Sequence, residues 1–304
     1  MKNVRFLLSS NPVNLETALK GKRSATVEAE YGAVTIQGSV LTLAHHGVNA
    51  GNPAPCSYDN GIGDDVDVVG LSHFDLDTLG GCAAILGVKP EAETFWKLAE
   101  FIDLNGAHKL QKGIEKAGAT EADVAKLFAY WAWSKNFRVF QNRDGSVSDV
   151  TAKVTEGCEV LRMILGGNEE ILAAGEAFKL GEQKLNEESF VDGSGGVLVR
   201  VGPQFVNHLY VDPWGNPHEA VVAFNTIHGS ITVSFAEKPI GDVNAETIVK
   251  KLWGHLASGH AAIAGSPRGE RMSIHDINDA AEEVVELLSE IERFNEAEML
   301  DLVK

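Results

Sequence analysis

The sequence predicts an α/β fold in two parts: an N-terminal α/β domain with a central β-sheet and a helical extension, and a smaller α/β C-terminal domain. In the first 90 residues, short β-type runs end in polar loops. Residues 90–188 then carry apolar residues at helical spacing. Alternating β-type runs return after the Gly-rich VDGSGG, residues 191–196. We therefore place the two domains at residues 1–190 and 191–304.

Two runs in the first part are typical of strands. Residues 33–44 form a β-type run with a hairpin predicted around residues 38–39, and it leads into a His-His-Gly turn. Residues 65–71, DVDVVGL, have no helical period, which favours a buried strand. SHFDLDT and then LGGCAAILG follow, and the latter is typical of a helix of small residues. Strand, polar turn and helix in this order indicate a fold whose sites form at the carboxyl ends of strands.

The later elements are predicted from periodicity alone. Helices are expected at residues 91–105, 120–140, 148–165 and 169–185, with the aromatic side chains of Tyr130, Trp131 and Trp133 in the core or in an interface. In the second part, strands are expected at residues 197–201, 205–211, 219–227 and 230–236, and helices at 244–253 and 273–304. The apolar stripe of the last helix fits packing on the body of the protein or a contact in a homodimer.

Composition excludes several function classes. The 304 residues carry 26 basic and 43 acidic side chains, a net charge of −17, and such a surface repels duplex nucleic acid. A small phosphorylated substrate stays open, because a metal ion or a basic pocket can override the mean field. No apolar stretch approaches the roughly 18 residues of a membrane span, and no signal peptide is recognisable. We therefore expect no membrane partner, a cytoplasmic location, and three reduced cysteines without a CxxC motif.

The densest group of chemistry-bearing side chains is SHFDLDT, residues 72–78. In an extended segment, the period of two places His73, Asp75 and Asp77 on one side. Two carboxylates so close repel each other unless a cation neutralises them, and carboxylates with imidazole suit Mn²⁺, Fe²⁺ or Zn²⁺. The alternative is a polar strand end at which Asp77 or Thr78 caps the next helix.

Two further pairs could complete a metal site. His45 and His46 end a predicted strand, where adjacent side chains point to opposite faces, so only a turn brings both to one ion. One buried and one exposed structural histidine fit the same pattern. Asp103 and His108 flank a break in helical spacing, which turn chemistry also explains. The predicted metal ligands are His45, His46, His73, Asp75, Asp77, Asp103 and His108.

A second candidate site lies in the C-terminal part. Residues 257–266, ASGHAAIAGS, surround His260 with small residues, so the backbone can approach a ligand and its N–H groups can cradle a phosphate or carboxylate. Arg268 could add a bidentate contact. A tight packing turn between a helix and a strand has the same composition. The predicted substrate-binding residues are Gly259, His260 and Arg268.

Two segments resemble one known family. SHFDLDTLGGCAAILG resembles the first motif of the DHH phosphoesterases, His-x-Asp-x-Asp before a Gly-rich helix start, and GHLASGHAAIAG resembles the Gly-Gly-Gly-His turn of the accessory DHHA1 domain. Thr78 stands where the family has glycine, and the turn keeps only Gly259 of its three glycines. No Asp-His-His triplet follows the first motif; the closest match, Ala-His-His-Gly at 44–47, precedes it. The resemblance is to a distant, rearranged or degenerate member, and it implies a DHHA1-like C-terminal domain.

Three functions follow as hypotheses. The first is a metal-dependent phosphoesterase that cleaves a small phosphorylated substrate, a nucleotide or short oligonucleotide, with His73, Asp75 and Asp77 at its catalytic centre. A divalent ion, Mn²⁺ before Fe²⁺, Zn²⁺ or Mg²⁺, would activate water there. The second is a metal-dependent hydrolase of a non-phosphate bond, because the first motif has no basic residue closer in sequence than Lys89. The third is a degenerate, DHH-like binding protein.

Overall fold

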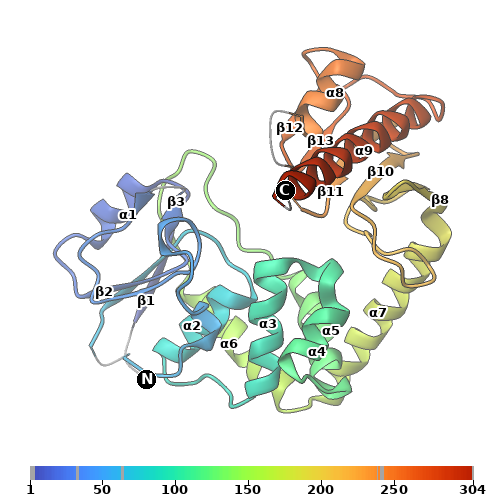
Figure 1. Ribbon diagram of the computed structural model, residues 1–304. Helices are drawn as coiled ribbons and strands as arrows, with labels where there is room; N and C mark the ends of the chain where they lie inside the picture. Colours follow the sequence, from blue (N-terminus) through green and yellow to red (C-terminus); the bar gives the residue numbers. More distant parts are fainter. Residues whose placement is uncertain (1–3, 32–33, 63–64, 238, 240–242, 303–304) are drawn as a thin grey trace. The chain divides into compact units, whose positions relative to one another are not determined.

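The computed structural model describes residues 4–31, 34–62, 65–237, 239 and 243–302, with side chains up to residue 290 (Figure 1). It is a mixed α/β structure, which confirms the predicted class. The chain forms two compact units, residues 1–179 and 180–304, and the division falls inside helix α7 (Glu169–Ser189). Within the described ranges, we find no helix with the length and apolar character that crossing a membrane requires.

The N-terminal unit is built on a five-stranded sheet in the order β5-β2-β6-β1-β7. Its strands are β1 (Arg5–Leu8), β2 (Ser24–Val27), β5 (Leu41–Leu43), β6 (Val68–Leu71) and β7 (Ser148–Asp149). All pairs are parallel except β1 with β7. The carboxyl ends of the neighbouring strands β5, β2 and β6 therefore lie at one edge of the sheet, where ligand sites of parallel sheets form.

Helices cover both faces of this sheet (Figure 1). Helix α1 (Pro12–Leu19) packs on one face through Leu15 and Leu19. Helices α2 (Leu76–Ile85) and α6 (Thr151–Leu165) cover the other face, where their side chains join the larger core cluster. Cys56, Cys82 and Cys158 are buried and form no disulfide, as predicted.

The two predicted N-terminal strands have different outcomes. Residues 65–71 do contain a buried strand, β6. The hairpin around residues 38–39 is wrong, because β4 (Val34–Thr35) pairs with β3 (Glu30–Tyr31) in a separate two-stranded sheet. The chain turns at Gly38, whose φ of 80° lies in the left-handed region, and β5 then joins the main sheet beside β2.

The predicted helical region is confirmed in outline. It contains α3 (Glu93–Asn105), α4 (Leu110–Ala117), α5 (Glu121–Ser134), α6 and α7. The helix expected at 120–140 ends at Ser134, and the residues after it form an irregular segment that reaches β7. Tyr130 lies in the core, whereas Trp131 and Trp133 are only half-buried against it.

The start of α5 supports a stability prediction. Asp123 accepts hydrogen bonds from the Thr120 backbone N–H at 2.9 Å and from the Thr94 hydroxyl at 2.8 Å, and Thr120 accepts one from the Asp123 N–H. Burial raises the pKa of Asp123, but these hydrogen bonds outweigh burial and hold it below its usual value. Asp123→Ala is expected to lower the free energy of unfolding at pH 7 by about 1–2 kcal/mol in urea titrations.

The pH dependence of this contribution has a defined sign. Because the pKa of Asp123 is lower in the folded chain, its stabilisation is complete above the unfolded value of about 3.9 and is lost as pH falls through the folded value. Glu121→Ala, in the same turn and exposed, is the matched control and should change the free energy by less than about 0.5 kcal/mol. Equal effects of the two substitutions would contradict the prediction.

The C-terminal unit contains a six-stranded sheet in the order β12-β13-β11-β10-β9-β8, and two helices. The elements are β8 (Phe190–Ser194), β9 (Val197–Gly202), β10 (Ala220–Asn225), β11 (Ser230–Phe235), α8 (Ala245–Trp253), β12 (Ser258–His260), β13 (Ile263–Gly265) and α9 (Asp276–Leu302). The strands predicted at 197–201, 219–227 and 230–236 and both helices are confirmed.

Helix α9 packs on this sheet through the predicted apolar stripe. Ile277, Ala280, Val284, Leu287 and Leu288 are buried in one cluster with residues of β9, β10, β11 and α8. This packing is one of the two arrangements that the stripe predicts. The stripe continues to residues 291 and 294, whose side chains lie outside the described part. The homodimer stays a prediction.

The strand predicted at residues 205–211 is wrong. Arg200 of β9, fully buried, donates from Nε to the carbonyl of Leu209 and from Nη2 to the carbonyl of Val211, both at 2.8 Å. Its Nη1 donates to the carbonyl of Asn186 near the end of α7, at 2.9 Å. The side chain of Arg200 therefore holds two carbonyls of this segment, whose strand-like pairing is limited to a bridge between Val211 and Pro217.

Candidate metal centre

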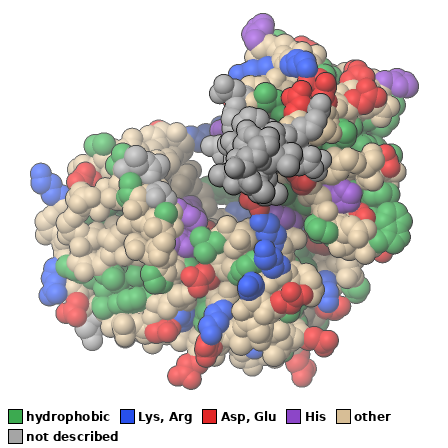
Figure 2. Space-filling view, viewed as in Figure 1, with side chains coloured by type: hydrophobic (Ala, Val, Ile, Leu, Met, Phe, Trp, Pro, Cys, Tyr) green, Lys and Arg blue, Asp and Glu red, His purple; other side chains and the backbone are tan. Residues whose placement is uncertain are grey.

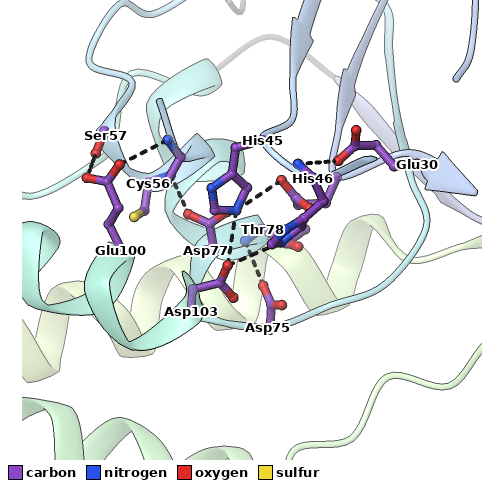
Figure 3. Close-up of polar contacts among 12 residues, drawn as sticks. Glu30, His45, His46, Cys56, Ser57, Asp75, Asp77, Thr78, Glu100 and Asp103 are labelled. Carbon is purple, nitrogen blue, oxygen red and sulfur yellow. Dashed lines mark hydrogen bonds and ion pairs between the residues drawn. The ribbon is translucent and has the colours of Figure 1, made fainter. Parts of the chain in front are cut away.

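Acidic and imidazole side chains converge at the edge where β2, β5 and β6 end. Glu28 directly follows β2, and His45 and His46 follow β5 after one residue. Asp77 lies in the first turn of α2, and Asp103 lies near the end of α3. Figure 3 shows Asp77 and Asp103 on the same side of the His45 ring, with His46 beside them.

His45 is the centre of this group. Its Nε2 atom lies 3.0 Å from Asp103 Oδ2, 3.3 Å from Asp77 Oδ2 and 3.7 Å from Glu28 Oε1. His46 Nε2 lies 3.3 Å from Asp103 Oδ2 and 3.7 Å from Glu28 Oε2. Two groups of potential metal ligands result, Glu28-His45-His46 and His45-Asp77-Asp103. Because Nε2 of His45 offers one lone pair, the two groups form a single centre around His45.

The crowded polar atoms of this centre fit a cation. Within the described part of the chain, no hydrogen bond reaches Oε1 or Oε2 of Glu28, either ring nitrogen of His45, Oδ2 of Asp77 or Oδ2 of Asp103. Carboxylate oxygens of Glu28, Asp77 and Asp103 share Nε2 of His45 as an ion-pair partner, and buried polar groups are normally paired more fully, so this crowding requires an explanation. Two ligand atoms that each lie about 2.1 Å from one ion, with a right angle between them at the ion, are about 3 Å apart. The shortest distances between ligand atoms of this centre are close to that value. These buried side chains can hold a metal ion.

The electrostatics of the centre lead to the same conclusion. Burial and the charge of Asp77 raise the pKa of Glu28 to about 8. Burial alone would lower the pKa of His45, but the adjacent Asp103, Asp77 and Glu28 outweigh it and raise it to about 10. The carboxylates thus favour the protonated, positively charged form of His45. A divalent ion bound at the same place would supply a larger positive charge.

Neighbouring carboxylates fix the loop that carries the two histidines (Figure 3). Glu30 accepts hydrogen bonds from the His46 N–H at 2.9 Å and from the side chain of Asn49 at 2.7 Å. The Oδ1 atom of Asp77 accepts the Cys56 N–H at 2.8 Å, which leaves Oδ2 facing His45. Such contacts orient a ligand before an ion binds.

Close packing of α2 brings this loop to the sheet. A side chain on Gly80 would place its Cβ 2.7 Å from Cβ of Cys56, and one on Gly81 would place it 2.9 Å from Cβ of Pro55. Only glycine fits at such distances. The glycine pair after Asp77 therefore allows residues 55–56 to lie directly on α2, next to the centre.

His73 and Asp75 lie outside these two groups. Residues 72–75 are not an extended strand, because β6 ends at Leu71 and Asp75 is the N-cap of α2, accepting the Thr78 N–H at 2.8 Å. The expectation that residues 73, 75 and 77 share one side of an extended segment is therefore wrong. Asp77 enters the buried centre, whereas His73 Nε2 pairs with Asp75 Oδ2 at 3.1 Å, with both side chains about two-fifths exposed.

The His73–Asp75 pair still belongs to the surroundings of the centre. Burial lowers the pKa of His73, but Asp75, and then the charges of Glu28 and Asp103, outweigh burial and raise it. His46, 45% exposed at its side chain, also reaches solvent. Histidine side chains are visible at the surface of the N-terminal unit in Figure 2. His108 lies in the turn after α3 and in neither ligand group.

Glu28 is the ligand candidate that sequence reasoning missed. It follows the small and β-branched run Ser24–Val27, which is short enough to escape notice as a strand. The signal was an acidic residue directly after a buried run, the same pattern that identified residues 72–78. Glu28 also has a φ of 47°, which non-glycine residues rarely adopt and which is commonly retained at functional sites.

The predicted substrate-binding residues lie in the C-terminal unit. Gly259 and His260 are on β12, the edge strand of the sheet, and both are exposed. A Cβ on Gly259 would lie 2.4 Å from Cα of Ala264, so close pairing of β12 with β13 accounts for this glycine. Arg268 is exposed in the loop after β13.

Comparison of the sequence with known proteins does not place the chain in a family. No protein-family model matches the chain, and no curated protein matches it in sequence.

Proposed function

We propose that this protein is a metal-dependent phosphoesterase that cleaves a small phosphorylated substrate at the centre around His45. One observation supports this proposal above others: four elements bring Glu28, His45, Asp77 and Asp103 together, and three of their carboxylate oxygens share a single imidazole nitrogen. A mixed carboxylate and imidazole set suits Mn²⁺, with Fe²⁺, Zn²⁺ and Mg²⁺ as alternatives. When bound, such an ion lowers the pKa of a coordinated water and polarises a phosphoryl oxygen.

The residues around the centre have separate roles in this proposal. Glu28, His45, Asp77 and Asp103 hold the ion, and His46 approaches it from the solvent side. His73, oriented by Asp75, is placed to donate a proton to the leaving group. The C-terminal unit would be a DHHA1-like domain in which Gly259, His260 and Arg268 contact the substrate.

A basic side chain near the centre favours phosphate over other substrates. The sequence offered none near the first motif, which supported a hydrolase of non-phosphate bonds as the alternative. In the structure, Arg138 lines a pocket together with Asp75, Asp77 and Asp103. A guanidinium group beside a metal centre is a common partner of phosphoryl oxygens.

The test begins with metal content. Protein purified without chelator is expected to contain close to one or more equivalents of Mn, Fe or Zn by mass spectrometry, and Mn²⁺ should raise the melting temperature of the stripped protein. Mn²⁺-loaded protein should hydrolyse bis(p-nitrophenyl) phosphate and leave p-nitrophenyl acetate at the background rate. EDTA should abolish the activity, and added Mn²⁺ should restore it.

Two results would contradict this proposal. Absence of bound metal together with no thermal shift on adding Mn²⁺ would reject both hydrolase hypotheses and leave the degenerate, DHH-like binding protein. Bound metal with hydrolysis of the acetate alone would favour the non-phosphate hydrolase. His73→Gln tests the proton donor separately: with diphenyl phosphate, whose phenolate leaving group is more basic, hydrolysis should fall about 10²-fold or more, while hydrolysis of bis(p-nitrophenyl) phosphate falls much less and metal content stays unchanged.

A further inference from the structure

A pocket of about 510 Å³ opens beside the metal centre in the N-terminal unit. Asp75, Asp77 and Asp103 form part of its wall, so a molecule in the pocket lies within reach of the centre. The remaining wall comes from α5 and from the irregular segment that follows it. This volume is in the range of pockets that hold small molecules, and it is too small for a folded partner.

Aromatic rings dominate the wall away from the carboxylates. Trp131, Trp133, Phe137, Phe74 and Phe140 all line the pocket. The rings of Trp133 and Phe137 are stacked with centroids 4.2 Å apart and an interplanar angle of 23°, and Phe74 lies 6.0 Å from Phe137. These contacts fix the rings before a ligand binds, and the Lys153 ammonium lies over the Phe137 ring, 4.4 Å from its centroid.

The pocket also has a cationic side. Arg138 lines it, and in the described part of the chain its guanidinium donates only from Nε, to the carbonyl of Lys135 at 3.1 Å. Among the described residues, no carboxylate forms an ion pair with Arg138. Gln141 donates to the carbonyl of Ser72, which joins this segment to the end of β6 beside the centre. An anion that approaches the acidic cluster would find a compensating charge here.

We propose that this pocket binds a flat aromatic group that is joined directly to the reacting phosphate, and that Arg138 contacts a phosphate oxygen. This inference rests on the proposed function, since it assigns the substrate class of the same centre. The lining of the pocket supports it, because two carboxylates of the centre, a guanidinium and several aromatic rings share one cavity. An aliphatic phosphoester would leave the aromatic wall without a matching surface, whereas an aryl or heteroaromatic group stacks on it.

The test uses two phosphonates that cannot be hydrolysed. Phenylphosphonate carries the ring and methylphosphonate lacks it, and both are titrated calorimetrically into the full-length, Mn²⁺-loaded protein. Wild type is expected to bind phenylphosphonate about 10-fold or more tightly than methylphosphonate. Trp133→Ala should reduce this preference toward 1, and Phe140→Ala, whose ring is 71% exposed and can be removed without disturbing the core, should also reduce it.

Controls separate the ring from the charge. Arg138→Gln should weaken both phosphonates by a similar factor and keep the ratio. Phe205→Ala, a 60% exposed ring of the C-terminal unit, should change neither. Equal binding of the two probes by metal-loaded wild type, or a preference that survives both Trp133→Ala and Phe140→Ala, would overturn the pocket assignment and leave the phosphoesterase in place. Wild type that holds no metal would overturn both.

Discussion

Replacing His45 with alanine is expected to remove stably bound metal from the protein. His45 belongs to both ligand groups, and its Nε2 lies 3.0 Å and 3.3 Å from carboxylate oxygens of Asp103 and Asp77. Loss of a residue that only orients a ligand typically costs about 10–100-fold in metal affinity, so loss of the shared ligand should cost more than 100-fold. Hydrolysis of bis(p-nitrophenyl) phosphate should fall to background with it.

Metal content by mass spectrometry and Mn²⁺ titration by calorimetry check this prediction. His208→Ala is the matched control, because His208 is also paired with a carboxylate, at 3.0 Å from Glu182, but lies in the C-terminal unit. Asp103→Asn keeps the size of the side chain and provides a second variant if His45→Ala does not fold. Wild-type metal content in both His45→Ala and Asp103→Asn would show that the ion binds elsewhere.

Local patterns in the sequence predicted four residues of this centre, but they did not show which of the candidates meet in space. His45, His46, Asp77 and Asp103 come from three separate segments, each recognised as a polar turn after a strand or at the end of a helix. Their meeting depends on the strand order β5-β2-β6, and pairing between distant strands leaves no local signal. Glu28 was missed for a local reason, because the four-residue β2 was not recognised as a strand that ends at this edge.

The start of helix α2 explains why the spacing of residues 73, 75 and 77 was misinterpreted. The spacing of residues 73, 75 and 77 indicates one shared side only if the segment is extended. Capping of α2 by Asp75 ends the extended stretch first, so the helix geometry turns Asp77 toward the loop and leaves Asp75 with His73. The sequence offered Asp77 or Thr78 as the cap of this helix, and that alternative is wrong, because Asp75 is the N-cap of α2.

Arg200→Met is expected to destabilise the C-terminal unit by about 3–5 kcal/mol. In the run VLVRV, alternation would place an arginine toward solvent, yet Arg200 is fully buried and its guanidinium donates to carbonyls of Asn186, Leu209 and Val211. Burial lowers the pKa of Arg200 to about 10, so it remains charged at neutral pH. Methionine fills similar space but leaves several buried carbonyls without donors, each at a cost of about 1–3 kcal/mol that is not fully additive.

Urea titrations measure the loss of stability, and hydrogen exchange shows whether the loss is confined to the C-terminal unit or extends to the whole chain. Amide protection should fall in β9 and in residues 205–211, because the side chain holds two carbonyls of this segment, while β1, β2 and β6 stay protected. Arg271→Met is the matched control: Arg271 is exposed, in the same unit, and donates to one carbonyl, that of Ile227. A loss below about 1 kcal/mol for Arg200→Met would mean that water or a shifted backbone satisfies the three carbonyls, and the segment would then not depend on Arg200.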